Sequence, residues 1–453
     1  MADVQPSPDA FDFEVETLIV GAGACGLVAA LAARDAGQQV LVIEADAVPQ
    51  GSTALSAGLI PAAGTRFQKA AGIDDDPAMF ARDIQAKAHG ENDPVLVDAM
   101  ATGAGPVVEW LADRFGLPFS VVENFDYPGH SRRRMHGLPS RAGRELIDRL
   151  RQAAEGEGID IICERRARTL FADGRRITGI AMTRPDGGVE TVGCGKLILA
   201  CNGFGGNRDK VADLLPGISD ALWFGHDGNR GEALDWGAAL GAATHHLGAY
   251  QGHGNVAHPH GILITWAVIT EGGVQVNTEG QRFWDESQGY SEAARQVVAQ
   301  PGGLAVTIFD ARIADIARQF EDFQAAEAQG AVKSADTLDA LAAAFDLPGD
   351  ALRATMDSLP ERGVDAFGRA WPGGQALAPP YMGVRVTGAL FHTQGGLRTD
   401  GTGRVIGTDG APFPNLFAAG GAACGVSGSG DSGYLSGNGL LAAVTLGYAA
   451  GRA

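Results

Sequence analysis

Apolar and polar positions near the start of the chain alternate between the pattern of strands and the pattern of a helix. Residues 16–20 form an apolar run typical of a buried strand, residues 27–36 are Ala-rich and helical, and residues 39–43 are apolar again. Two strands that flank a helix within ~30 residues form one βαβ unit. The pattern therefore predicts an α/β fold that opens on this unit.

The pattern of predicted helices and strands changes twice in the later part of the chain. Helices are expected around an Arg- and His-rich loop within 93–158, and strands at 159–181, 196–200 and 273–277, followed by Ala-rich helices within 311–357. A strand at 415–419 and a closing helix at 440–450 return to the texture of the first half. We expect a disordered tail at 1–12, a nucleotide-binding domain from 13–244 and 373–453, and an inserted α+β cap domain at 245–372.

Charge and composition limit the classes of binding partner that are expected. The 453 residues include 35 Lys and Arg against 54 Asp and Glu, for a net charge of −19, which argues against nucleic acid or an anionic membrane surface as the main partner. The 66 glycines gather in short runs at the ends of apolar segments. Such runs allow the backbone to approach a large ligand closely. A small-molecule substrate is therefore expected.

The cysteines and the N-terminal residues indicate where the protein works. There are five cysteines, and no two of them form a C-x-x-C pair, so a disulfide framework or zinc site is not expected. Residues 1–10 lack the basic start and apolar core of a signal peptide. The sequence contains no run of about 18 apolar residues, so no membrane-spanning helix is expected. We therefore expect a soluble, cytoplasmic protein.

The turn after the first strand carries a dinucleotide-binding pattern. Gly21, Gly23 and Gly26 are spaced as G-x-G-x-x-G between a strand and a helix, and Glu44 ends the second strand. The first glycine allows the tight turn, the second allows close approach of a pyrophosphate, and the third allows the helix to pack on the strand. A similar pattern at 428–433 has too few residues after it for a second βαβ unit, so one dinucleotide is expected.

With these motifs in order, the chain resembles the flavoproteins related to fumarate reductase and 3-ketosteroid Δ1-dehydrogenase. Further matches are GSTALSAG at 51–58, LACNGFGGN at 199–207, DGNRG at 227–231, AAGG at 418–421 and SGNGLL at 436–441. The resemblance implies a Rossmann-like FAD-binding domain with an inserted cap domain, the active site lying between them. It also implies that FAD is held by Gly21, Gly23, Ala24, Cys25, Gly26, Glu44, Ala45, Gly51, Ser52, Thr53, Ser56, Ala57, Gly58, Ala167, Asn202, Gly203, Asp227, Gly421, Asn438, Gly439, Leu440 and Leu441.

Three features depart from the family or refine the comparison with it. Cys201 and Asn202 stand where the family usually has Thr-Gly, and Gly421 stands where an acid is common. No histidine lies within 51–58, where respiratory succinate dehydrogenases attach their flavin covalently. Noncovalent FAD is therefore expected.

The family divides into two chemistries, and the candidate active-site residues resemble one of them more closely. Fumarate reductases hold a dicarboxylate with a Thr-Glu pair, a histidine and an arginine, and they protonate it with another arginine. At the corresponding positions this chain has Trp266 in place of the acid, and Tyr290 and Tyr434 in place of the two arginines. Only His392 is retained. Ketosteroid dehydrogenases instead have tyrosines at comparable positions.

The resemblance therefore predicts desaturation of a cyclic ketone at its α,β carbons, either a 3-ketosteroid or a smaller cyclohexanone-type substrate. Tyr434 and a backbone N–H, of Gly437 or Asn438, would polarise the carbonyl, and Tyr290 would remove the α-proton while flavin N5 takes the β-hydride. Tyr127 is a candidate supporting residue. Trp266, Tyr381 and His392 are expected to line the substrate pocket. The electron acceptor is not specified by the sequence.

Other interpretations remain open at this point. The main alternative is a fumarate-reductase-like enoate or enone reductase running the reverse chemistry, and a third is a flavoprotein subunit that only passes electrons to a partner. A tyrosine is most often a packing residue. His253, His258 and His260 have a spacing that matches no common zinc pattern, so no metal site is predicted. The basic run 132–136 fits either a solvated loop or a contact to a substrate carboxylate.

Overall fold

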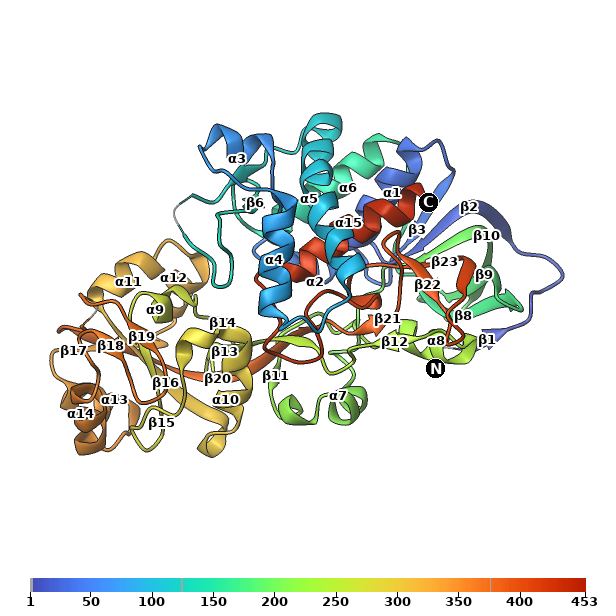
Figure 1. Ribbon diagram of the computed structural model, residues 1–453. Helices are drawn as coiled ribbons and strands as arrows, with labels where there is room; N and C mark the ends of the chain where they lie inside the picture. The colour runs from blue at the N-terminus through green and yellow to red at the C-terminus, as the bar shows by residue number, and fades with distance from the viewer. Residues whose placement is uncertain (1–2, 124, 375) are drawn as a thin grey trace. The chain divides into compact units, whose positions relative to one another are not determined.

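The fold comes from a computed structural model that describes residues 3–123, 125–374 and 376–453 (Figure 1). The chain forms two compact units. Unit 1 contains residues 1–214, 225–250 and 392–453, and unit 2 contains residues 215–224 and 251–391. Both units combine helices with parallel and antiparallel strands, which confirms the predicted α/β class.

Unit 1 is built on a nine-stranded sheet whose central strands are buried. Its main path runs β1-β8-β9-β10-β2-β3-β7, with β23 pairing β10 and β22 pairing β23. The neighbours β10, β2, β3 and β7 are parallel, as expected when helices cover both faces. The strands are β1 (Asp3–Gln5), β2 (Phe13–Val20), β3 (Val40–Ile43), β7 (Asp160–Ile162), β8 (Arg166–Asp173), β9 (Arg176–Thr183), β10 (Val189–Leu199), β22 (Arg404–Ile406) and β23 (Pro412–Ala418).

Two helices from opposite ends of the chain lie side by side in unit 1. Figure 1 shows α1 (Ala24–Asp35), in blue, next to α15 (Asn438–Arg452), in red. Small residues allow this approach, because a Cβ on Gly447 or Gly451 would lie 2.7 Å or 2.4 Å from a backbone oxygen of α1. The closing helix therefore completes the domain that the first βαβ unit begins.

The remaining helices of unit 1 surround this sheet. The long helix α5 is apolar enough to cross a membrane by length and composition, but half of its apolar window is buried. Its buried side chains belong to the same core as the sheet, so it serves as a core helix. The helices are α2 (Gly51–Ala54), α3 (Arg66–Ala70), α4 (Pro77–Lys87), α5 (Pro94–Phe115), α6 (Gly143–Gly156), α7 (Arg208–Leu214) and α8 (Glu232–Leu240), and the short strands are β4 (Ile60–Pro61), β5 (Ser120–Val121), β6 (Met135–Gly137), β12 (Thr244–His245) and β21 (Gly396–Leu397).

Unit 2 is organised around the long strand β20. Its seven-stranded sheet follows the order β14-β13-β20-β16-β15, and β11 and β17 also pair with β20. The strands are β11 (Leu222–Trp223), β13 (Tyr250–Ala257), β14 (Ile262–Leu263), β15 (Val274–Asn277), β16 (Leu304–Asp310), β17 (Val332–Ala335) and β20 (Tyr381–Thr393), with a separate hairpin of β18 (Gly363–Val364) and β19 (Ala370–Trp371). The helices are α9 (Ala267–Thr270), α10 (Tyr290–Val298), α11 (Ala311–Ala317), α12 (Glu321–Ala328), α13 (Leu338–Phe345) and α14 (Gly349–Asp357).

The structure differs from the sequence-based expectations at two places. Residues 3–5, expected within a disordered tail, form β1 and pair in parallel with β8. The inserted unit comprises 215–224 and 251–391 rather than the expected 245–372, because residues 381–387 of β20 pair with β16 and β11 joins the same sheet. The local pattern of apolar and polar residues did not reveal either strand pairing, because both pairings join segments that are far apart in the chain.

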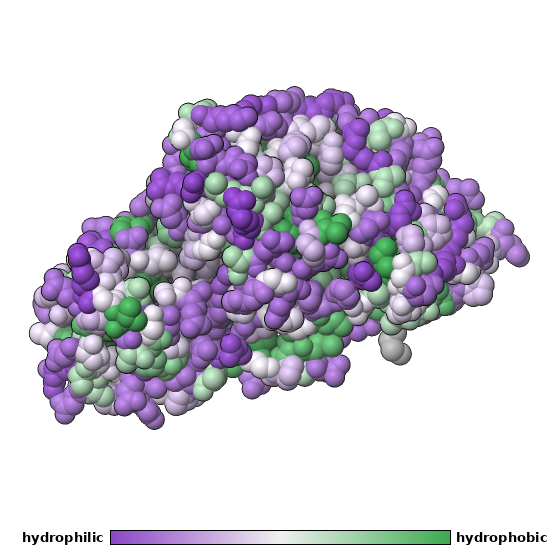
Figure 2. Space-filling view, viewed as in Figure 1, coloured by the Kyte–Doolittle hydropathy of each residue, from purple (hydrophilic) through white to green (hydrophobic). Residues whose placement is uncertain are grey.

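Figure 2 shows that hydrophilic residues cover most of the visible face and that hydrophobic residues form scattered patches. Single exposed apolar side chains are normal on protein surfaces.

Candidate active site

The glycines of the first turn have separate structural roles. A Cβ on Gly26 would lie 1.8 Å from the Gly21 carbonyl oxygen, and Gly21 itself has a positive φ of 105°. These two glycines are therefore required by the turn and by helix–strand packing. A Cβ on Gly23 would meet only Thr53 Oγ1, at 3.6 Å. The protein's own packing does not require glycine there, which fits a residue kept small for a ligand phosphate.

This packing predicts that Gly26→Ala unfolds the nucleotide-binding turn. The added methyl group would overlap the Gly21 carbonyl, and overpacking typically costs 1–3 kcal/mol or more. We expect a lower melting temperature and loss of bound flavin. Gly156→Ala is the matched control, because a Cβ there meets nothing within 4 Å at the end of α6, and it should be neutral or slightly stabilising. Equal melting temperatures for both variants would contradict this account.

Glu44 lies at the end of β3 with its carboxylate turned toward the same turn. Its Oε2 accepts from the Ala22 N–H at 2.7 Å and its Oε1 accepts from the Asp46 N–H at 3.0 Å. The side chain is 8 % exposed. This position beside the N-terminus of α1 is where a ribose hydroxyl is expected in a dinucleotide site. Ala45 follows it directly, and Cys25 lies in the first turn of α1, where burial raises the pKa of its thiol.

The short helix α2 joins three segments of unit 1. Thr53 Oγ1 accepts from the Ala24 N–H at 3.0 Å, which fixes α2 against the start of α1. Ser52 Oγ accepts from Asn202 Nδ2 at 3.0 Å and from Asn229 Nδ2 at 2.9 Å. Asn229 is buried and was not predicted from the sequence. Its position two residues after Asp227 in the DGNRG motif could have indicated it.

The turn after α2 carries three more of the predicted cofactor residues, Ser56, Ala57 and Gly58. Ser56 Oγ donates to the Thr53 carbonyl at 2.7 Å, and the Gly58 N–H donates to Ser56 Oγ at 3.1 Å. Gly58 has a positive φ of 63°, and a Cβ there would lie 2.9 Å from the Ala142 carbonyl carbon. The turn is therefore fixed by its own hydrogen bonds and by contact with the start of α6.

Two departures from the family pattern are coupled in space. A Cβ on Gly421 would lie 2.1 Å from Asn202 Oδ1 and 3.0 Å from the backbone nitrogen of Gly203. Asn202 itself has a positive φ of 63° and accepts from the Gly203 N–H at 2.9 Å. The asparagine side chain thus occupies the space that an acidic residue at position 421 would need. The asparagine at position 202 and the missing acid at position 421 therefore have one steric explanation.

The other predicted cofactor residues also lie in unit 1. Ala167 is buried in β8, Gly51 begins α2, and Gly439, Leu440 and Leu441 form the first turn of α15. Asp227 is exposed in the loop before α8, next to His226, whose Nε2 lies 2.7 Å from Asp46 Oδ2. Residues from both ends of the chain therefore surround one helix N-terminus, as an FAD-binding domain requires.

Tyr434 lies directly before α15 and is 6 % exposed. The backbone N–H groups of Gly439 and Gly437 donate to its phenol oxygen. Burial is the larger effect and raises the pKa of Tyr434 above its ordinary value, so the phenol is protonated at neutral pH. The Gly437 N–H, predicted to contact the substrate, is thus directed at Tyr434. With its oxygen accepting from the backbone, the phenol is oriented to donate its own proton.

His392 lies beside Tyr434, with the ring centroids 5.6 Å apart. Burial lowers the pKa of His392 to about 4, so the imidazole is neutral at pH 7. A Cβ on Gly439 would come within 2.9 Å of His392 Nε2, which places this nitrogen against the first turn of α15. Tyr434, His392 and the helix N-terminus therefore bring neutral hydrogen-bond donors together in unit 1.

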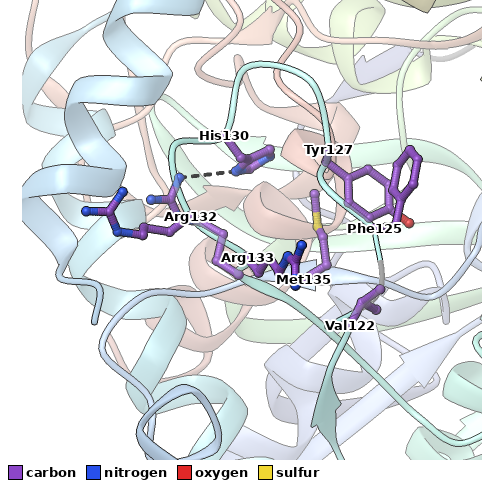
Figure 3. A pocket seen from close by; sticks show the side chains of 8 residues that line it. Val122, Phe125, Tyr127, His130, Arg132, Arg133 and Met135 are labelled. Carbon is purple, nitrogen blue, oxygen red and sulfur yellow. Dashed lines mark hydrogen bonds between the residues drawn. The ribbon is translucent and has the colours of Figure 1, made fainter. Parts of the chain in front are cut away.

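A loop of unit 1 contains Tyr127 and supports the turn that carries Tyr434. Figure 3 shows Tyr127 next to Phe125 in a small pocket that Val122, His130 and Met135 also line. Burial raises the pKa of Tyr127 to about 12. His130 Nε2 contacts the Ser436 carbonyl at 2.9 Å, and His130 Nδ1 faces Arg134 at 3.2 Å.

The basic run 132–136 does not form a free cationic surface. Arg134 is buried and forms ion pairs with Asp75 at 2.9 Å and Asp83 at 2.5 Å. His136 is also buried, within 2.8 Å of Thr65 Oγ1, and Arg133 pairs with Asp126. Arg132 and Arg133 are exposed, as expected of a solvated loop, whereas Arg134 and His136 are buried. The buried members of this segment are structural.

Tyr290 begins α10 in unit 2, within a cluster of aromatic rings. It stacks on His253 at 5.0 Å, and His253 stacks on Phe391 at 5.5 Å. Trp266 meets His253 edge-on at 5.6 Å and lies 6.4 Å from the Tyr290 ring. Burial lowers the pKa of His253 to about 3, so this histidine adds no charge. The aromatic cluster is apolar and neutral, and it includes two predicted site residues.

A buried ionic network holds the segment before Tyr290. Glu286 is fully buried, and its carboxylate accepts from Arg282 at 2.5 Å, from Arg369 at 3.2 Å and from the Gln275 N–H at 3.0 Å. Arg282 also pairs with Asp365 at 2.6 Å. Glu286 thus has a structural role, because it fixes the backbone from which Tyr290 extends.

Tyr381 is not part of this cluster. It lies at the start of β20, whereas Phe391 lies ten residues later on the same strand, roughly 33 Å away at the usual rise per residue. Tyr381 packs instead against the separate core that contains Leu341 and Phe345. The structure therefore does not bring Tyr381 together with the aromatic cluster that contains Trp266 and Tyr290. Within the described residues, no group of three or more potential ligands could hold a metal ion.

A family model described as an FAD binding domain matches residues 16–440. The chain belongs to this family. Its predicted cofactor, FAD, is thereby confirmed, and the glycine turn, the buried Glu44 and the helix N-terminus described above fit that cofactor.

The relatives within this FAD-binding family include enzymes of both chemistries. The chain is 30% identical to a probable fumarate reductase of Shewanella frigidimarina, over 96% of this chain and 74% of that protein. It is 25% identical to a 4-oxocyclohexanecarboxylate 2-dehydrogenase of Sinomonas cyclohexanicum, over 96% of this chain and 92% of that protein. The protein is an FAD-dependent oxidoreductase.

The solved structures with the same fold include a fumarate reductase and a ketosteroid dehydrogenase. A flavocytochrome c3 fumarate reductase in an open conformation matches with a TM-score of 0.83 and 28% identity, over 98% of this chain and 78% of that chain. A 3-ketosteroid Δ4-(5α)-dehydrogenase from Rhodococcus jostii matches with a TM-score of 0.75 and 24% identity, over 98% and 97% of the two chains. At that identity the second likeness shows the fold alone.

The buried arginines of the described residues all have hydrogen-bond or ion-pair partners. Three arginines are almost fully buried among the described residues, and each is paired with a carboxylate: Arg134, Arg282 and Arg369. Arg141 is half-buried without an acidic partner, but its guanidinium donates to Ser120, Val121 and Gly137. None of these four offers a free guanidinium to a substrate carboxylate.

Proposed function

We propose that the protein is a dehydrogenase that desaturates a cyclic ketone at its α,β carbons. The observation that carries this proposal is the neutrality of the two tyrosine environments. Tyr434 lies among protonated or neutral donors, and Tyr290 lies in an uncharged aromatic cluster, while the buried arginines are paired with acids. Such surroundings suit a carbonyl and an apolar ring better than they suit two carboxylates.

The residues have distinct roles in this proposal. The phenol O–H of Tyr434 donates a hydrogen bond to the substrate carbonyl, and His392 is a second neutral hydrogen-bond donor beside it. Polarising the carbonyl makes the α-proton acidic, and one such donor contributes about 3 kcal/mol to transition-state stabilisation. Tyr290 removes the α-proton as general base and takes it onto its phenolate oxygen, with Trp266 forming part of the wall around it. An ordinary phenol has a pKa of about 10, so this role requires hydrogen bonds or positive charge that favour the phenolate form. FAD, when bound, accepts the β-hydrogen as a hydride, so the ketone loses two electrons and two hydrogens.

A small ring is the favoured substrate. One relative, matched over 92% of its own length, acts by its description on a 4-oxocyclohexanecarboxylate. We propose a cyclohexanone-type ketone first and a 3-ketosteroid second. Tyr127 remains a proposed supporting residue. The five free thiols favour a reducing, cytoplasmic location.

The reverse reaction is the second candidate. Other relatives, including the one at 30% identity, are described as fumarate reductases. The same groups could reduce an enone, with Tyr290 returning the proton to the α-carbon. The direction depends on the electron donor or acceptor.

We expect the purified protein to be yellow and to release its flavin when denatured. No histidine lies within residues 51–58 to attach the flavin covalently. Acid precipitation followed by absorption spectroscopy of the supernatant and the pellet measures this directly. Flavin that stays with the pellet after washing would contradict noncovalent binding.

We also expect fumarate to be neither bound tightly nor reduced. Neither Tyr290 nor Tyr434 can carry a positive charge, and a tyrosine cannot replace the bidentate, charge-assisted contact that an arginine gives a carboxylate. The assay is fumarate-dependent oxidation of a reduced viologen under anaerobic conditions. Rapid turnover, saturating at low fumarate concentration, would show that this interpretation of the site is mistaken.

The proposed reaction itself is tested by analysing the product. The holoenzyme is incubated with 4-oxocyclohexanecarboxylate or a 3-ketosteroid and an artificial electron-accepting dye, and the product is analysed by mass spectrometry. We expect a product that has lost two hydrogens and carries the new double bond beside the carbonyl. Unchanged ketones across a panel of ring sizes, with flavin bound, would refute the proposed substrate class.

A further inference from the structure

A chain of buried side chains runs from His392 to the first residue of α15. Gln394 Nε2 lies 3.0 Å from His392 Nδ1, Ser427 Oγ lies 2.8 Å from Gln394 Oε1, and Asn438 Nδ2 lies 3.0 Å from Ser427 Oγ. Gln394, Ser427 and Asn438 are 5 %, 1 % and 0 % exposed. The sequence analysis singled out only the two ends, His392 and Asn438. Gln394 and Ser427 connect them.

The donors and acceptors in this chain follow one direction. The Asn438 amide donates to Ser427, the Ser427 hydroxyl donates to the Gln394 carbonyl, and the Gln394 amide donates to His392. His392 Nδ1 is therefore an acceptor. Because burial keeps the imidazole neutral, its single proton must then be on Nε2. The Thr393 carbonyl lies 3.4 Å from Nδ1, beyond the usual range for an N–H donor, and competes weakly.

The far end of the chain has an unsatisfied group. Asn438 Oδ1 is buried and has no hydrogen-bond partner among the described residues. A buried acceptor without a partner costs free energy unless a ligand supplies a donor. Residue 438 belongs to the segment expected to contact FAD. A donor on the bound cofactor at this position would fix the orientation of the Asn438 amide, and with it the direction of the whole chain.

We propose that Gln394 is a positioning residue. Asn438 and Ser427 fix the orientation of its side-chain amide, and this amide holds neutral His392 with its proton on Nε2. In this tautomer Nε2 is a donor beside Tyr434 and the first turn of α15. The inference deepens the proposed function, because it explains how His392 could donate to a substrate carbonyl without being charged. It concerns only residues within unit 1, and it can be tested without a substrate.

The test is ring ¹H–¹⁵N correlation spectroscopy of the FAD-loaded protein labelled with ¹⁵N-histidine. The signals of His392 are assigned from their loss in His392→Asn, and the spectrum shows which ring nitrogen is protonated. We expect the proton on Nε2 in the wild type. In Gln394→Glu the ionised side chain can only accept, so the proton should move to Nδ1 and the pKa of His392 should rise by about one unit or more. Gln152→Glu, on the exposed side of α6, adds the same charge and should change neither.

A second variant keeps the test decisive if Gln394→Glu fails to fold. Gln394→Met retains the volume but removes the donor, leaving the Thr393 carbonyl beside Nδ1, so the preference for Nε2 protonation should be lost. A wild-type spectrum with the proton on Nδ1 would overturn the proposal, and so would an unchanged tautomer in both Gln394 variants. A switch of tautomer in an enzyme that does not oxidise ketones would uphold the positioning role and refute only the proposed function.

Discussion

Tyr290→Phe is expected to reduce the rate of flavin reduction by a cyclic ketone by about 10²–10⁴-fold, the usual contribution of general acid–base catalysis. The substitution removes one hydroxyl and keeps the ring, so stacking on His253 and contact with Trp266 should remain. Binding of the ketone should therefore change little. Stopped-flow measurement of flavin reduction over a range of ketone concentrations separates the two effects.

Tyr381→Phe is the matched control for this experiment. It removes the same atom from the same unit, at the end of β20 that is remote from Phe391, and it should leave the rate of flavin reduction unchanged. If Tyr290→Phe also retains near-wild-type rates on the best substrate, Tyr290 is a packing residue of the aromatic cluster. The assignment of the base would then have to be abandoned.

Tyr434→Phe should have a different signature, because Tyr434 donates to the carbonyl both before and during the reaction. Removal of one oxyanion donor typically costs about 10²–10³-fold in rate. Since the same hydrogen bond is present in the bound substrate, affinity should fall as well. The N–H groups of Gly437 and Gly439 would also lose the oxygen to which they donate. We therefore expect a lower rate and a weaker apparent binding constant.

Tyr448→Phe tests whether this effect is specific. Tyr448 lies near the other end of α15, with its ring 4.9 Å from Trp110, and should tolerate the loss of its hydroxyl. A Tyr434→Phe enzyme that loses rate but binds ketone as tightly as the wild type would indicate that Tyr434 does not contact the carbonyl. Equal effects of both variants would indicate a general loss of stability.

The cofactor site was predictable because its signal is local. Gly21, Gly23 and Gly26 lie within one turn, and the packing around Gly21 and Gly26 requires glycine at both positions. Glu44 follows from the length of one βαβ unit. Strands at 16–20 and 39–43 and the intervening helix agree with β2, β3 and α1 to within a few residues. Chemistry encoded within about 30 residues of sequence can be read without the fold.

The polar contacts around Tyr434 were not predictable, because they depend on long-range packing. Ser427 lies 33 residues from Gln394 in the sequence, and Asn202 lies 150 residues from Ser52, yet each pair forms a hydrogen bond. The same reason explains why the sequence did not reveal that Tyr381 packs against the core that contains Leu341 and Phe345.

The most direct test of the central claim is anaerobic titration of the oxidised enzyme with single substrates, monitored by the visible absorption of its flavin. The account predicts that 4-oxocyclohexanecarboxylate or a 3-ketosteroid bleaches the flavin in a stoichiometric reaction, and that succinate does not. Bleaching by succinate with no response to any cyclic ketone would contradict it, and would show that the site handles dicarboxylates despite Tyr290 and Tyr434.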